Sequence, residues 1–160
     1  MEKMLNEYLQ FAKSQFSEKT DRFNISDLID ETIREYKNEN ITQNLIENIY
    51  LNGRKNLIKR CLNNLIDNSL KYSKLLNINI NKSNNHIIII LDDDGPGIPK
   101  NEYENVFKPF YKIDKSRGDS KSSVGLGLSI ASDVIRSHGG NINLDKSPLN
   151  GLRVKILLPF

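Results

Sequence analysis

A run of five aliphatic residues, Ile87 to Leu91, passes directly into the acidic and glycine-rich stretch 92–98. The run is far shorter than the roughly 18 apolar residues that span a bilayer, and its lack of alternation predicts a central strand of a sheet. The strand must end where the acids and glycines begin, because Asp, Gly and Pro are turn formers. The rest of the chain therefore has to fold around a sheet whose central strand ends in a polar, glycine-rich turn.

The composition is that of one globular domain. The 160 residues are enough to bury a core, and 38% hydrophobic with 27% charged residues is typical of a soluble protein. One cysteine excludes a disulfide framework and a multi-thiolate metal site, and no apolar signal core follows Met1. The net charge of +3 is too small to indicate nucleic-acid binding without a clustered patch. The composition therefore predicts a cytosolic globular domain.

Periodicity elsewhere in the chain predicts helices and strands in mixed order. Helices are expected over 4–16, from an N-cap at Ser26 to Tyr36, over 55–72, and over 124–138, where two glycines end the last one. Strands are expected over 23–25, 76–82, 87–92, 141–146 and 152–158, with a weak strand pair or one strand within 41–51. Helices that cover one face of a mostly antiparallel sheet form an α+β, two-layer domain.

The helix expected over 55–72 carries a polar sector beside its apolar stripe. At about 100° per residue, Asn64, Asn68, Lys71 and Tyr72 fall on this sector. An amide oxygen, a cation and a phenol could meet magnesium and phosphate, because Mg²⁺ prefers hard oxygen ligands and keeps several waters. The alternative is a solvated polar face in a chain rich in asparagine, which is the simpler interpretation of this sector taken alone.

The turn after the central strand holds Asp93, Gly95 and Gly97. Two glycines at this spacing let the backbone approach a flat ligand closely, and a carboxylate beside them can accept a hydrogen bond from an exocyclic amine such as that of adenine. Three adjacent acids would alternatively bind a metal or form only a turn. In isolation the turn is the simpler interpretation.

A second glycine motif, 125–128, stands at a predicted helix start. Backbone N–H groups and the helix dipole at such a start can hold a phosphate chain. The motif is neither a Rossmann fingerprint nor a P-loop, because it opens no βαβ unit and lacks Gly-Lys-Ser/Thr. The basic segment before it suggests a lid over a phosphate site, or simply a solvated loop. Its cations are Lys108, Lys112, Lys115, Arg117 and Lys121.

In this order and spacing the motifs resemble the ATP-binding catalytic domain of sensor histidine kinases, in the ATPase superfamily that includes HSP90, DNA gyrase and MutL. The stretch 64–73 resembles that family's N box, 93–98 its G1 box, 106–111 its F box and 125–128 its G2 box. The resemblance covers about residues 20–160. It implies a Bergerat-type fold, in which about three helices cover one face of the sheet, with ATP and Mg²⁺ as cofactors.

The resemblance also implies roles for individual residues. The residues that would contact the nucleotide are Asn64, Asn68, Lys71, Tyr72, Asp93, Gly95, Gly97, Ile98, Phe107, Lys112, Gly125, Leu126, Gly127 and Leu128. Asn68 would ligate magnesium, with Asn64 in support, and Asp93 would receive the adenine amine. The residues expected to act in catalysis are Asn68, Lys71, Lys112 and Arg117, the last two as lid cations that reach the γ-phosphate.

Asn64 distinguishes between branches of the superfamily. In the gyrase, MutL and serine-kinase branches, a glutamate four residues before the N-box asparagine serves as a base. Asn64 holds that position here, and a neutral amide cannot accept a proton at pH 7. This argues against ATP hydrolysis and serine phosphorylation, and favours a histidine acceptor, whose neutral imidazole is already nucleophilic. Residues 98–117 and 131–144 most resemble the osmosensing subclass, which pairs with winged-helix DNA-binding response regulators.

The acceptor histidine is expected outside this chain, because His86 and His138 both lie in structural contexts. Residues 1–19 are expected to be the remnant of the second helix of a dimerisation and phosphoacceptor hairpin with its linker, and residues 20–160 the catalytic domain. The parent is expected to be a homodimeric sensor in the inner (cell) membrane of a bacterium, with this domain in the cytoplasm. Its partners would be its own hairpin and a response regulator, without direct nucleic-acid contact.

Two other functions fit parts of the pattern. A nucleotide-sensing interaction module would bind ATP at the same motifs without transferring phosphate. A basic-loop nucleic-acid binder would need the five cations of the segment before the second glycine motif to act as one patch. Nucleotide binding and phosphotransfer assays distinguish these alternatives.

Overall fold

The central strand of the main sheet is β5 (His86–Asp93), as the aliphatic run predicts. The sheet has five strands in the order β2 (Ile41–Asn44), β4 (Leu76–Lys82), β5, β7 (Leu152–Pro159) and β6 (Asn141–Lys146). Strand β2 runs parallel to β4, and the other neighbouring strands are antiparallel. This computed structural model describes residues 6, 9–10, 12–13, 17–113 and 126–160.

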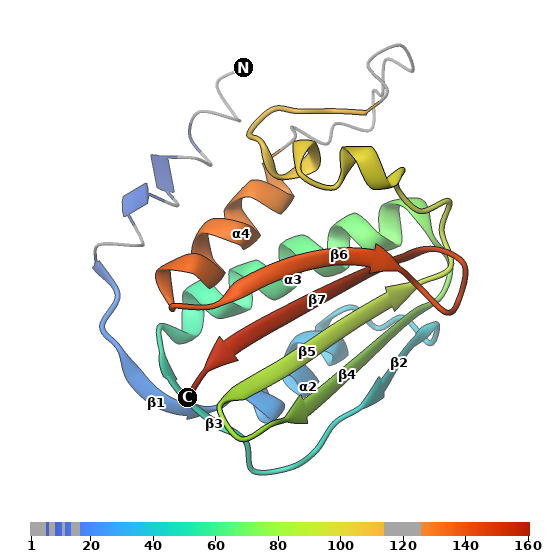
Figure 1. The fold of residues 1–160 in the computed structure, drawn as a ribbon. Helices are drawn as coiled ribbons and strands as arrows, with labels where there is room; N and C mark the ends of the chain where they lie inside the picture. Colours follow the sequence, from blue (N-terminus) through green and yellow to red (C-terminus); the bar gives the residue numbers. More distant parts are fainter. Residues whose placement is uncertain (1–5, 7–8, 11, 14–16, 114–125) are drawn as a thin grey trace.

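Helices α2 (Ile25–Glu35), α3 (Lys55–Tyr72) and α4 (Gly127–Ser137) lie together on one face of this sheet (Figure 1). Helix α3 packs against both of the others. A separate two-stranded sheet of β1 (Asp21–Asn24) and β3 (Tyr50–Gly53) lies beside the main one. The α+β, two-layer prediction with a mixed, mostly antiparallel sheet is confirmed. None of the described helices is long and apolar enough to cross a membrane.

The two faces of the central strand differ in burial. Ile87, Ile89 and Leu91 are buried under the helices, whereas Ile88 and Ile90 on the other face are only half-buried. The sheet alternates in the same way along β4 and β7, where every second residue enters the core. The unbroken aliphatic run therefore marks the middle of the sheet correctly, although the strand is covered by helices on one face only (Figure 1).

Two local predictions were wrong. Ser26 is not the N-cap of α2: the side chain of Asn24 accepts hydrogen bonds from the Ser26 and Asp27 N–H groups, at 3.1 and 3.3 Å. Ser26 is instead buried in the first turn, where its hydroxyl donates to the Ile46 carbonyl. The segment 41–51 does hold two strands, but they do not pair with each other. Strand β2 joins the main sheet and β3 pairs with β1, because their partners come from other parts of the chain.

Helix α4 ends as the glycine pair predicts. Gly139 has φ +77°, and the N–H groups of Gly139 and Gly140 donate to the Arg136 and Ile135 carbonyls, which closes the helix. The described part of this helix begins at Gly127, with Leu126 at the N-cap, rather than at the expected Val124, which lies outside the described residues. Most of the helix expected over 4–16 lies outside them as well.

Candidate functional site

The predicted site residues converge on one end of the molecule. Helix α3 and strand β5 both end there, and the segment that follows β5 passes from this point towards α4 (Figure 1). That segment contains two short 3₁₀ turns, Lys100–Glu102 and Asn105–Phe107, and the second of these packs against α4. The candidate site is therefore framed by the end of β5, the helices α3 and α4, and the segment between β5 and α4.

Asp93 is the buried carboxylate of this site. It is 5% exposed at the end of β5, and its Oδ1 accepts hydrogen bonds from the Gly95 N–H at 3.0 Å and the Leu152 N–H at 2.9 Å. Both hydrogen bonds fall on Oδ1, so Oδ2 receives none from the described part of the chain. Oδ2 is not among the buried atoms without a partner, so it is open to the outside and can accept a hydrogen bond from the amine of a ligand.

The neighbouring carboxylates have other partners. Asp92 forms a bidentate ion pair with Arg153, at 2.7 Å to Nε and 2.9 Å to Nη2. Asp94 accepts from the Lys74 and Leu75 N–H groups at 2.9 and 2.8 Å, and these hydrogen bonds lower the pKa of its carboxyl. The described residues contain no group of three metal-ligating side chains. The alternative of a three-acid metal cluster is therefore not supported, because each carboxylate faces a different partner.

The glycines of this turn stand where a side chain would not fit. A Cβ on Gly95 would lie 2.8 Å from the Tyr72 carbonyl oxygen at the end of α3. Gly97 has φ +72°, a left-handed conformation that favours glycine. The turn therefore lies directly against the end of α3, beside a shallow hollow lined by Lys71, Tyr72 and the turn itself.

The polar sector of α3 faces this end of the molecule. The Nδ2 atom of Asn64 is buried and has no hydrogen-bond partner among the described residues. Asn64 lies against the start of α4, where a Cβ on Gly127 would be 3.9 Å from its carbonyl oxygen. One turn further along, Asn68 is half-buried, and Tyr72 is 51% exposed with the Lys71 ammonium 5.4 Å from its ring centre. A buried amide without a partner is a group that a bound ligand would satisfy.

The start of α4 offers backbone donors. No described side chain caps this helix, and its first N–H groups precede the first helical hydrogen bond, from Ile130 to Leu126 at 2.9 Å. Leu126 is buried and Leu128 packs against the core, so the backbone rather than these side chains faces outwards. Uncapped N–H groups with the positive end of the helix dipole suit a phosphate. Gly125 lies outside the described residues.

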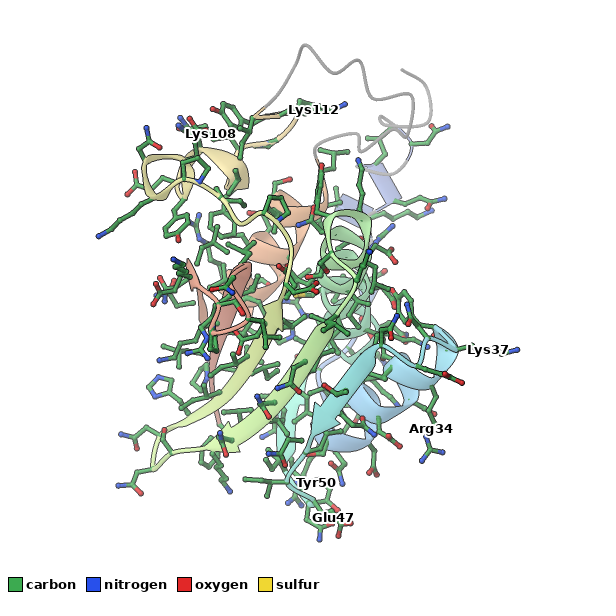
Figure 2. All side chains as sticks on the ribbon, turned by 90° about the vertical axis from the view of Figure 1, so that its right-hand side faces the viewer. Arg34, Lys37, Glu47, Tyr50, Lys108 and Lys112 are labelled. Carbon is green, nitrogen blue, oxygen red and sulfur yellow. The ribbon has the colours of Figure 1, made fainter. Side chains whose placement is uncertain are left out.

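The remaining predicted residues lie on the segment between β5 and α4. Ile98 and Phe107 are half-buried and pack against the core. Lys108 and Lys112 lie at the opposite end of the molecule from Tyr50 (Figure 2). The Lys108 ammonium donates to the Asn105 side chain at 2.9 Å, whereas the Lys112 ammonium has no hydrogen-bond partner among the described residues. Arg117, Lys115 and Lys121 lie outside the described residues.

The set of donors fits Mg-ATP. A single asparagine oxygen, without a carboxylate cluster, suits Mg²⁺ that takes its other ligands from phosphate oxygens and water. Asn68 would supply that ligand. The unpartnered Nδ2 of Asn64 and the uncapped start of α4 are donors for phosphate oxygens.

Neither histidine lies in this site. The Nε2 atom of His138 accepts from the Arg54 N–H at 3.0 Å and its Nδ1 lies 2.7 Å from the Val134 carbonyl, so both ring nitrogens are used. Burial lowers the pKa of this imidazole, which keeps it neutral. His86 is exposed at the first residue of β5, about 23 Å along the eight-residue strand from Asp93. The structural interpretation is supported for His138, whereas the exposed His86 lies away from the site.

Sequence reasoning missed the contribution of the turn between β6 and β7. The Leu152 N–H holds Asp93, and the Gly151 N–H donates to the Asp93 carbonyl at 3.1 Å. The signals here were the turn dipeptide Asn150-Gly151 before the last strand and the resemblance of the stretch 151–154 to the end of the family's domain. The dipeptide predicts a turn, but neither signal shows that the turn meets a strand from the middle of the chain.

Comparison with known proteins gives one consistent family. The model described as histidine kinase-, DNA gyrase B- and HSP90-like ATPase matches residues 53–160. The sensor histidine kinase CpxA of Escherichia coli (strain K12) is 37% identical over 111 residues, which are 69% of this chain and 24% of CpxA. The sensor histidine kinase WalK of Bacillus subtilis (strain 168) is 32% identical over 176 residues, covering 100% of this chain and 28% of WalK.

A solved structure shares the fold. The catalytic domain of the histidine kinase ThkA superposes with a TM-score of 0.75 at 26% identity, covering 88% of this chain and 95% of that chain. The chain thus matches nearly all of an isolated catalytic domain, whereas it spans about a quarter of the length of the curated relatives.

Proposed function

Because the chain belongs to the family of histidine kinase-, DNA gyrase B- and HSP90-like ATPases and forms the catalytic ATP-binding domain of a two-component sensor histidine kinase, we propose how its residues serve that reaction. It binds Mg-ATP between α3, α4 and the turn after β5, and transfers the γ-phosphoryl group to a histidine on a separate helical domain. The observation that best supports this proposal is the environment of Asp93. Two backbone N–H groups donate to its Oδ1, and Oδ2 is left for the adenine amine.

The transfer itself needs little from the protein beyond position and charge. A neutral imidazole nitrogen attacks the γ-phosphorus, the P–O bond to the β-phosphate breaks, ADP leaves with that electron pair, and the imidazole releases its N–H proton to solvent. Bound Mg²⁺ would neutralise phosphate charge, with Asn68 as its protein ligand. Lys71, Lys112 and Arg117 are the cations that we assign to the phosphates, and Tyr72 to the phosphates and ribose.

The chemistry of α3 supports a histidine acceptor over water or serine. Asn64 is a neutral amide and cannot accept a proton at pH 7. Asp67, the only acidic residue in α3, accepts a hydrogen bond from the Tyr36 hydroxyl at 2.8 Å on the side of the helix that meets α2. Burial and, after it, this hydrogen bond raise the pKa of the Tyr36 hydroxyl. The described part of α3 therefore presents no carboxylate base to the nucleotide.

The acceptor belongs to another domain in this proposal. His138 uses both ring nitrogens, and His86 stands at the far end of β5 from Asp93. We assign residues 1–19 to the end of a dimerisation hairpin and its linker, and residues 20–160 to the catalytic domain. The names of CpxA and WalK as sensor histidine kinases support a parent that forms a homodimer and passes the phosphoryl group to a response-regulator aspartate.

Three finer assignments complete the proposal. The parent is a bacterial inner-membrane sensor with this domain on the cytoplasmic side, because the relatives are sensor proteins. It falls in the osmosensor-like subclass, on the resemblance of residues 98–117 and 131–144. Its response regulator is then of the winged-helix DNA-binding type, and the domain itself makes no contact with nucleic acid.

The test is transfer between two purified parts. The chain is mixed with γ-labelled ATP, Mg²⁺ and the acceptor hairpin of the full-length protein. Acid-labile, base-stable label on the hairpin is the expected result, and replacing the hairpin histidine by alanine should remove it. Nucleotide binding without transfer would favour a nucleotide-sensing module instead. Absence of nucleotide binding would contradict both functions.

A further inference from the structure

The turn between β6 and β7 touches the adenine-site carboxylate more closely than a side chain would allow. A Cβ on Gly151 would lie 2.2 Å from Asp93 Oδ1, 2.4 Å from the Asp93 carbonyl oxygen and 2.5 Å from the Gly95 nitrogen. The oxygen distance is the shortest found for any described glycine. The backbone of Gly151 is not in the left-handed region, so the constraint is the lack of space rather than the conformation.

This close approach delivers hydrogen bonds to Asp93. The Gly151 N–H donates to the Asp93 carbonyl at 3.1 Å, and the next N–H, of Leu152, donates to Oδ1 at 2.9 Å. The Gly95 N–H supplies the second bond to the same oxygen at 3.0 Å. One carboxylate oxygen is thus fully engaged from two directions, which fixes the rotation of the carboxyl group about its Cβ–Cγ bond.

The turn is itself held in shape. Ser147 is 3% exposed, and its hydroxyl accepts from the Leu149 N–H at 3.0 Å. The Ser147 N–H donates to the Gly151 carbonyl at 2.9 Å, and Asn150 takes the left-handed conformation at φ +76°. The turn therefore reaches Asp93 as a preformed unit, and its geometry does not depend on a bound nucleotide.

We propose that Gly151 is a positioning residue for purine selection: its missing side chain lets the turn hold Asp93 Oδ1, so that Oδ2 is presented to the 6-position of the base. The proposal rests on the assignment of Asp93 to the adenine amine. A fixed carboxylate oxygen accepts from a 6-amino group and opposes a 6-oxo group, because two acceptors then face each other. A carboxylate free to rotate loses part of this selection.

The substitution that tests this is Gly151→Ala. Its Cβ forces either the turn to withdraw from Asp93 or the carboxyl group to rotate, and both break the bond from the Leu152 N–H. We expect the ratio of ATP to inosine-triphosphate affinity to fall about tenfold, the scale of one hydrogen bond to a charged group. Calorimetry with Mg²⁺ on the folded chain measures both affinities.

A matched glycine provides the control. A Cβ on Gly140 would lie 2.3 Å from the Leu157 carbonyl oxygen, which is an equally severe clash. This position is far from Asp93, because Leu157 pairs with Ile88 near the other end of β5. Gly140→Ala should lower the melting temperature as much as Gly151→Ala and leave the ATP to inosine-triphosphate ratio unchanged. A merely structural role for Gly151 predicts the same unchanged ratio in both variants, and that outcome would overturn the proposal.

A double-mutant cycle separates this proposal from the function that it rests on. Asp93→Asn should reduce the same ratio, and adding Gly151→Ala should reduce it no further, because Gly151 acts through that carboxylate. Additive effects would overturn the positioning role. A wild-type chain that does not distinguish the two nucleotides would instead refute the assignment of Asp93. Should Gly151→Ala not fold, Ser147→Ala loosens the same turn, and an unchanged ratio in that variant also counts against the proposal.

Discussion

Asn68 illustrates how much one amide can contribute when it is the only protein ligand proposed for a metal ion. We expect Asn68→Ala to bind ATP without magnesium as the wild type does, and to lose about tenfold or more of the affinity that Mg²⁺ adds. Calorimetry of ATP binding in Mg²⁺ and in chelator measures the two terms separately. Asn56→Ala, an exposed residue at the other end of α3, is the control. A retained magnesium effect in Asn68→Ala would contradict the ligand assignment.

Cys61 is a second single residue with a measurable consequence. It is 1% exposed within the apolar stripe of α3, and burial raises the pKa of its thiol to about 12. The thiolate is the reactive form, so the native protein should react with Ellman's reagent at pH 8 at least about 100-fold more slowly than the protein unfolded in guanidinium. As the only cysteine in the chain, its labelling rate reports opening of the core directly. Equal rates in the two states would contradict the burial.

At the scale of elements, the start of α3 depends on a residue far away in the chain. Arg54 is the N-cap residue of α3, and its side chain makes no capping hydrogen bond. The first turn of the helix holds no acidic residue either. Glu18 supplies the cap instead: its two carboxylate oxygens accept from the Asn56 and Leu57 N–H groups at 2.8 and 3.1 Å. The segment before β1 is thereby attached to the helix whose other end carries Asn68.

We therefore predict that Glu18→Ala lowers the free energy of unfolding by about 1 kcal/mol, the usual effect of losing a cap together with its charge at a helix start. Urea denaturation followed by circular dichroism gives the value. Glu39→Ala, which removes an exposed acid elsewhere, should change it little. Equal stabilities for the two variants would show that the cap contributes nothing in solution.

At the scale of the whole molecule, His138 connects the end of α4 to the start of α3. Its ring accepts from the Arg54 N–H and packs against Gly53, where a Cβ would lie 2.9 Å from the ring. Burial lowers the pKa of this imidazole and the nearby Arg54 lowers it further, against the opposing effect of Glu18 and the Val134 carbonyl. Protonation would break the bond from Arg54 and place a second cation beside that arginine.

The sign of the pH effect follows from this. The pKa in the folded state is below the value near 6.5 of an unfolded histidine, so the unfolded chain binds more protons between the two values. Stability from His138 is complete above about pH 6.5 and is lost as the pH falls towards the folded pKa. Urea unfolding between pH 7.5 and 5 should show this slope, His138→Gln should flatten it, and His86→Gln should retain it.

The main elements could be predicted because their signals are local. The helix 55–72 and the strands 76–82 and 141–146 match the structure residue for residue, since an apolar stripe or alternation sets each one. What failed depends on distant partners. The pairing of β2 with β4 in parallel, and of β3 with β1, follows from packing around α2 and α3, which no window of the sequence contains.

The residues of the candidate site also divide into those with a local sequence signal and those whose role depends on a distant partner. Asp93, Gly95 and Asn68 could be predicted because the order and spacing of their motifs resemble the family's, although each motif alone has a simpler interpretation as a turn or a solvated face. Gly151 could not, since a glycine before a final strand is common, and its meaning comes only from the Asp93 oxygen that it meets. The prediction of Ser26 rather than Asn24 as the helix cap failed for a smaller reason, because both residue types cap helices well.

The half-buried isoleucines of β5 have a consequence for how the strand finds its alignment. Because isoleucine occupies both faces, sliding the strand by one residue costs little apolar burial, and the hydrophobic pattern alone leaves its alignment weakly specified. The two acids at its end favour one alignment. Asp92 points to the open face and pairs with Arg153, whereas Asp93 points under the helices and accepts from the Leu152 N–H. A one-residue deletion among the isoleucines would exchange these two carboxylates. Asp93, which we assign to the adenine amine, and its neighbour Asp92 thus also select the native one of two strand alignments that bury similar apolar surface.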